Sequence, residues 1–182
     1  MNLRPLVFAV LCVSCACASA PKINYYSLGM ESSDEARPAV NLTVERLRTT
    51  EALGRSQIMI RASATRIEYY AVDHWAGGLG ELVQQRLATA FGPPVEGRNT
   101  FKVSGMVVAC EQVDRPGGSE ARVKLNIVIR DADEARYQPP LLEKTYQASR
   151  GVAKPCVEAL VDVLSRCVDQ IAAEIAADVS SL

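Results

Sequence analysis

The sequence has few of the residue types from which catalytic and metal sites are built. Only one histidine, His74, occurs in 182 residues, so a histidine-based metal cluster is excluded. A single histidine beside Trp75 is more typical of local packing or capping than of a general base. Cys110, Cys156 and Cys167 lack the CxxC spacing of zinc and thioredoxin-like sites. We therefore expect a protein that is not an enzyme, with no cofactor and no bound metal.

The sequence also gives no support for a phosphate-binding loop, a calcium-binding loop or a nucleic-acid-binding surface. Gly77-Gly78-Leu79-Gly80 is not a GxGxxG motif and no Lys-Ser or Lys-Thr pair follows it, so we expect close helix packing there. Asp131, Asp133 and Glu134 stand outside any glycine-anchored calcium loop and predict a solvated turn. The net charge is −1 and no segment concentrates Lys and Arg, which disfavours nucleic-acid binding.

No apolar run is long enough to cross a bilayer. The run from Leu6 to Val13 has about eight residues, whereas a spanning helix needs roughly 20. Arg4 precedes this run and small residues follow it before Pro21, which is the plan of a secretory signal. We predict that residues 1–16 are a signal peptide and that the mature chain does not span a membrane.

The residues alone leave the processing site open. Ala18-Ser19-Ala20 suits ordinary signal peptidase, but Pro21 lacks an N–H and should fit badly in an extended protease cleft. Lipoprotein processing needs a cysteine after small residues, and Cys17 or Cys15 could serve. We favour lipoprotein processing, with ordinary secretion as the alternative.

Export would permit a disulfide. Cys156 and Cys167 are separated by about 16 Å along one predicted helix and cannot be bridged. A bond between Cys110 and Cys156 is possible, and buried free thiols are the alternative that we favour.

The pattern of apolar residues predicts an α+β fold, an antiparallel sheet of about five strands with two helices packed on one face. Residues 39–182 should form one domain, and residues 17–38 the lipidated cysteine and a tether, in which 23–28 could add an edge strand. Asp73 is the expected N-cap of the first helix, and Pro155 should lie in the first turn of the second. Strands are expected over 40–44, 58–61, 66–70, 101–113, 122–130 and 141–148, and helices over 75–91 and 155–179.

Several short motifs along the chain match the pattern of a known family. Cys17 and Pro21 are followed by Asn24-Tyr25-Tyr26-Ser27-Leu28, then by Ile67-Glu68-Tyr69-Tyr70, and then by Asp73-His74-Trp75-Ala76. The sequence thereby resembles the ABC-type transport auxiliary lipoproteins, the PqiC-like family, over nearly its whole length.

The resemblance implies a lipoprotein that faces the periplasm and is anchored in the outer membrane. Cys17 matches the acylated position because it stands eight residues before Tyr25, and Ala18 agrees with sorting to the outer membrane. The implied partners are an MCE-family lipid-binding protein and an inner-membrane ABC or related transporter, with phospholipid or another hydrophobic molecule as cargo.

Three points stay open at this stage. A homo-oligomer is possible. An envelope assembly or structural lipoprotein with no role in transport is the alternative function. The aromatic residues of the motifs could contact a partner, but we expect most of them to pack within the sheet or the core; they are Tyr25, Tyr26, Tyr69, Tyr70 and Trp75.

Overall fold

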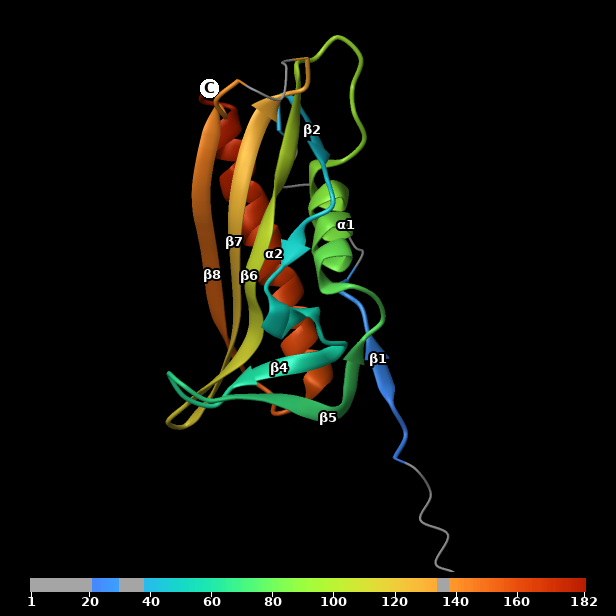
Figure 1. Ribbon diagram of the computed structural model, residues 1–182, viewed down its shortest axis with the longest axis vertical. Helices are drawn as coiled ribbons and strands as arrows, with labels where there is room; N and C mark the ends of the chain where they lie inside the picture. The colour runs from blue at the N-terminus through green and yellow to red at the C-terminus, as the bar shows by residue number, and fades with distance from the viewer. Residues whose placement is uncertain (1–20, 30–37, 134–137) are drawn as a thin grey trace, which may run out of the picture.

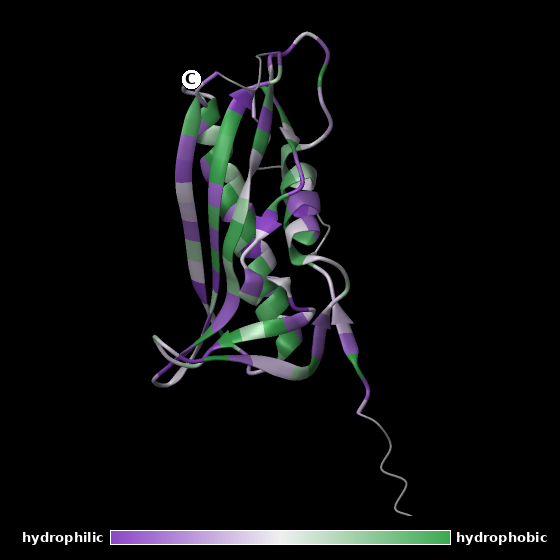
Figure 2. Cartoon of the chain, viewed as in Figure 1, coloured by the Kyte–Doolittle hydropathy of each residue, from purple (hydrophilic) through white to green (hydrophobic). Residues whose placement is uncertain are grey.

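Three long strands form the centre of the fold. The computed structural model describes residues 21–29, 38–133 and 138–182. Within them β6 (Thr100–Arg115), β7 (Gly118–Asp131) and β8 (Leu142–Val152) run antiparallel in chain order. Hydrophobic and hydrophilic residues alternate along these strands (Figure 2), because successive side chains of a strand point to opposite faces. One face of this part of the sheet is therefore apolar, and the other is wet.

The short strands make the sheet mixed rather than antiparallel. β2 (Asn41–Val44), β3 (Arg48–Thr49) and β4 (Gln57–Arg61) pair in turn, all parallel, with the free edge of β6. β5 (Ile67–Trp75) pairs antiparallel with β4, and β1 (Asn24–Tyr26) pairs parallel with β5 at the end of the sheet. The prediction of about five antiparallel strands was wrong. β6 is longer than any partner on that edge, so several segments share it, which gives an eight-stranded sheet.

Two helices cover the apolar side of the sheet. α1 (Leu79–Phe91) lies beside β2, and the longer α2 (Val157–Val179) runs along β7 and β8 (Figure 1). A short 3-10 helix, η2 (Glu51–Gly54), connects β3 to β4. The α+β architecture with two helices is thus confirmed. Among the described residues, neither helix is long and apolar enough to span a membrane. Along the middle of β7 the inward side chains are fully buried under the helices; they are Ala121, Val123, Leu125, Ile127 and Ile129.

Both helices begin later than the periodicity predicts. Trp75 is the last residue of β5, and the N-cap of α1 is Gly78. Asp73 is not a cap, because it lies in β5 and its carboxylate accepts hydrogen bonds from β1. Pro155 lies outside α2, whose N-cap is Cys156. The expected close helix packing is confirmed only at Gly80, where a Cβ atom would lie 2.2 Å from the Leu47 carbonyl oxygen; Gly77 and Gly78 precede the helix, and a Cβ atom at Gly78 would meet nothing within 4 Å.

A buried carboxylate joins three strands on the other face of the sheet. The Glu111 side chain is 0% exposed and accepts hydrogen bonds from Arg61 Nε at 3.1 Å and Arg122 Nε at 2.9 Å. These residues come from β6, β4 and β7. Because each buried charge has a partner, the cluster satisfies the requirement for ion pairs inside a protein.

The three described cysteines are free thiols. Cys110 and Cys167 are buried between the sheet and α2, whereas Cys156 is exposed at the start of that helix. The possible bond between Cys110 and Cys156 is absent because one side chain faces the core and the other faces solvent. Burial raises the pKa of the Cys110 thiol strongly and that of Cys167 to about 11.

This difference in burial predicts selective labelling. A thiol reagent at neutral pH should modify Cys156 quickly in the folded protein, because the thiolate is the reactive species and must be reachable. Cys110 and Cys167 should react only after unfolding, and peptide mapping by mass spectrometry would show this. Labelling in denaturant, where all three should react, is the control, and equal labelling of Cys110 and Cys156 in the native protein would contradict the fold.

Candidate functional site

The first described residues lead the chain from the predicted lipidation site into the fold. β1 pairs with the last residues of β5, and Asn24 Nδ2 donates a hydrogen bond to Asp73 Oδ1 at 2.8 Å. The Tyr26 hydroxyl lies 3.2 Å from the same oxygen and 3.1 Å from Glu158 Oε1. Burial, together with the hydrogen bond to Glu158, raises the pKa of Tyr26 to about 12. The segment is therefore fastened to the sheet and to the start of α2.

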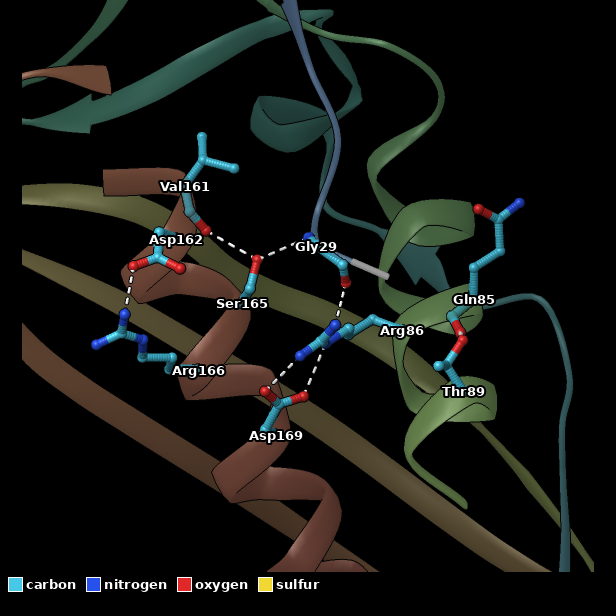
Figure 3. Close-up of polar contacts among 9 residues, drawn as sticks. All are labelled: Gly29, Gln85, Arg86, Thr89, Val161, Asp162, Ser165, Arg166 and Asp169. Carbon is cyan, nitrogen blue, oxygen red and sulfur yellow. Dashed lines mark hydrogen bonds and ion pairs between the residues drawn. The ribbon is translucent and has the colours of Figure 1, made fainter. Parts of the chain in front are cut away.

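The same segment then enters a junction between the two helices (Figure 3). Leu28 is buried, and the Gly29 N–H donates to Ser165 Oγ in α2 at 3.0 Å. The Gly29 carbonyl accepts a hydrogen bond from the Arg86 guanidinium in α1. Arg86 in turn donates to both carboxylate oxygens of Asp169, at 2.7 and 2.5 Å. We call these four residues, Gly29, Arg86, Ser165 and Asp169, the anchor junction.

The anchor junction is held by a paired buried charge. Arg86 is only 6% exposed, and its planar guanidinium meets Asp169 through two parallel hydrogen bonds. A guanidinium cannot lose its proton in a protein, so the charge must be matched where it lies. The junction therefore ties the N-terminal segment and both helices into one unit.

A cavity of about 540 Å³ opens at the end of β5, the strand with which β1 pairs. It lies where β3, η2, the end of β5 and the start of α1 meet. On one side of the cavity, α1 approaches the backbone of Leu47, in the chain after β2. This approach is possible because Gly80 has no side chain. The N-cap residue of α1 is Gly78, which has no side chain to accept a hydrogen bond from the first N–H groups of the helix. The polar and aromatic residues that line the cavity include Arg46, Arg48, Arg55, Ser56, Trp75 and Glu81.

The charge of this lining is positive. Three guanidinium groups are opposed by one carboxylate, Glu81. All three arginines are exposed, and the Arg55 guanidinium lies 4.8 Å from the centre of the Tyr69 ring. Such a lining attracts anions.

The cavity and β1 form one continuous surface. The Tyr25 ring meets the His74 ring edge-on with centroids 6.0 Å apart, and His74 Nδ1 lies 3.1 Å from Ser56 Oγ. Ala76, which also lines the cavity, donates its N–H to the Tyr26 carbonyl at 2.7 Å. The only histidine is thus placed between β1 and the cavity wall, in contact with both.

The aromatic residues of the motifs divide into buried and exposed groups. Trp75 is buried, and the hydroxyls of Tyr69 and Tyr70 bind Ala52 O and Gln112 Oε1 within the fold. Tyr25 differs from them because 66% of it is exposed. Packing within the fold is therefore confirmed for most of these residues, and Tyr25 is the one free for an outside contact.

Other predicted site residues fall outside a shared site. Cys17 lies outside the described residues, as do Cys15 and Glu134. Asp131 and Asp133 form a local turn in which the Asp133 N–H donates to Asp131 Oδ1 at 2.9 Å. Within the described ranges no three His, Cys, Asp or Glu side chains come together as a metal site.

Two features of the site could not be predicted from the sequence. Arg86 interrupts the apolar face of α1, which is a signal for a buried ion pair, but its partner Asp169 lies 83 residues away. The arginines of the cavity come from a short strand and its flanking loops, so no segment shows them as a basic cluster.

The fold defines a class, an α+β domain whose first described residues, 21–29, are bound to the sheet and to both helices. The chain belongs to the family described as ABC-type transport auxiliary lipoprotein components, whose model matches residues 26–176. That description implies association with an ABC-type transporter and attachment to the cell envelope. The sequence matches no curated protein.

Solved structures show the same fold. A crystal structure of a DUF330-family protein from Xanthomonas campestris gives a TM-score of 0.71 at 16% identity, covering 87% of this chain and 99% of the other. A crystal structure of an uncharacterized protein gives 0.66 at 16% identity, covering 88% and 100%. At this identity the likeness concerns the fold alone.

Proposed function

We propose that the protein is a non-enzymatic lipoprotein of a trans-envelope lipid transport system. It is acylated at Cys17, faces the periplasm from the outer membrane, and works with an MCE-family protein and an inner-membrane ABC or related transporter. The observation that carries the proposal is the family match over residues 26–176. The cavity lining supports it further, since its three arginines offer groups that bind anionic headgroups.

Recovery of partners tests the transport role. A C-terminal tag is suitable because Leu182 is exposed. The tagged protein, expressed at its native level and cross-linked in cells, should bring down the MCE protein and transporter subunits. An unrelated tagged outer-membrane lipoprotein is the control. Recovery of neither partner, with the protein itself intact in the membrane, would favour a structural envelope role instead.

A further inference from the structure

The length of chain before the fold limits where the membrane can lie. The described chain begins at Pro21, four residues after Cys17. An extended residue spans at most about 3.5 Å, so an acylated Cys17 lies within about 14 Å of Pro21. Ile23 and Tyr25 follow closely, and 45% of Ile23 and 66% of Tyr25 are exposed. These side chains are therefore among the nearest parts of the fold to the lipid headgroups.

The described residues that follow this short connection are fixed to the fold. β1 is paired with β5, Leu28 is buried, and Gly29 is bound by both helices in the anchor junction. Single exposed apolar side chains are common on proteins and carry no argument alone. Here, however, an aliphatic and an aromatic residue follow the proposed acylation site by six and eight residues, and aromatic residues prefer the level of the headgroups.

The arginine-lined cavity adds positive charge to the same surface. Tyr25 contacts His74, His74 contacts Ser56, and Ser56 lines the cavity with Arg46, Arg48 and Arg55. A basic group near an anionic membrane surface is attracted to it, so this charge matches anionic phospholipid headgroups.

We infer that the acylated protein docks on its own bilayer through this surface, which we call the anchor-side surface. Ile23 and Tyr25 lie at headgroup level, and Arg46, Arg48 and Arg55 face anionic phospholipids. The inference rests on the proposed acylation of Cys17. It adds an orientation, in which the loop of residues 92–99 at the other end of the fold points away from the membrane (Figure 1).

Fluorescence quenching by brominated lipid tests the orientation. The acylated protein, with its mass verified, is reconstituted in phosphatidylcholine vesicles with or without phosphatidylglycerol. Tyr25→Trp places a probe on the anchor-side surface, and Val95→Trp, at a residue that is 46% exposed, places the matched probe at the far end. Trp75 is kept in every variant as a common background. The probe at 25 should lose emission and shift to the blue, and the probe at 95 should match the parent protein.

Charge variants test the role of the cavity. Arg46→Gln with Arg48→Gln leaves the contact of Arg55 with Tyr69 intact and should weaken docking about fivefold per arginine in phosphatidylglycerol vesicles. Lys102→Gln with Arg130→Gln removes the same charge from a cross-strand pair on β6 and β7, and should change nothing.

Each result decides the inference. Equal quenching at 25 and 95 in verified acylated protein would overturn the docking surface and leave the proposed function standing. If the quenching of the probe at 25 were the same with and without phosphatidylglycerol, and the same in the arginine variant, the role of the arginines would be overturned. A protein without acyl chains would overturn the proposed anchoring and this inference together.

Discussion

Replacing Asp169 with asparagine is expected to lower the free energy of unfolding by about 3 kcal/mol. The substitution removes the only charge that matches Arg86 in the anchor junction and leaves a buried guanidinium that cannot deprotonate. The estimate is at the lower end for a buried pair because Asp169 is partly exposed. Thermal unfolding followed by circular dichroism should show a midpoint lowered by roughly 6–12 °C.

Asp162→Asn is the matched control on the same helix. Asp162 pairs with Arg166 on the exposed face of α2, four residues away. Exposed pairs of this kind contribute only about 0.5 kcal/mol, so the midpoint should hardly move. If the two variants were equally stable, the account of the anchor junction as the tie between the N-terminal segment and the helices would be wrong.

Gly105→Ala is expected to be the most damaging single-methyl change, costing about 4 kcal/mol or preventing folding. Gly105 lies in the middle of β6 with φ of 150°, which side chains rarely adopt. A Cβ atom there would lie 2.0 Å from the Asn126 carbonyl oxygen in β7. Neither strand can move without breaking the ladder between them. Urea unfolding of the soluble variant, or its failure to accumulate, provides the measurement.

The same substitution at Gly151 separates this effect from glycine loss in general. Gly151 lies in β8, and a Cβ atom there would meet no other atom within 4 Å. Gly151→Ala should keep or slightly raise stability, because alanine reduces the freedom of the unfolded chain. A destabilisation there as large as at Gly105 would argue against the register of β6 and β7.

The long elements could be predicted because their patterns are long. β7 alternates strictly at Val123, Leu125, Ile127 and Ile129, and α2 keeps a helical spacing over six turns. Each pattern places its apolar residues on one face of the element, and in the structure that face packs against the core. The family likeness was also readable, because its motifs lie in segments that the fold keeps together around β1 and β5.

The direction of the short strands could not be predicted. A strand of five residues alternates in the same way whether its partner runs parallel or antiparallel. The first helix was wrongly predicted to begin at Trp75, because Trp75 stands four residues before Leu79 and continues the helical spacing. The pair Gly77-Gly78, which is poor in helix propensity, was the signal that the helix begins later.

The site depends on contacts between distant residues, which spacing cannot reveal. Arg86 meets Asp169, and Gly29 meets Ser165, across separations of 83 and 136 residues. The cavity is likewise lined by Arg48 from a strand and by Arg55 from a loop. In contrast, the importance of Cys17 follows from local sequence and family spacing, and it remains a prediction.

Intact-mass analysis of the mature protein from a bacterial host would show whether it is an envelope lipoprotein. We expect a triacylated chain that begins at Cys17. Cys15→Ser should leave that mass unchanged, because residue 15 belongs to the signal peptide, whereas Cys17→Ser should abolish it. An unmodified chain that begins at Pro21 would contradict acylation at Cys17 and the proposed anchoring.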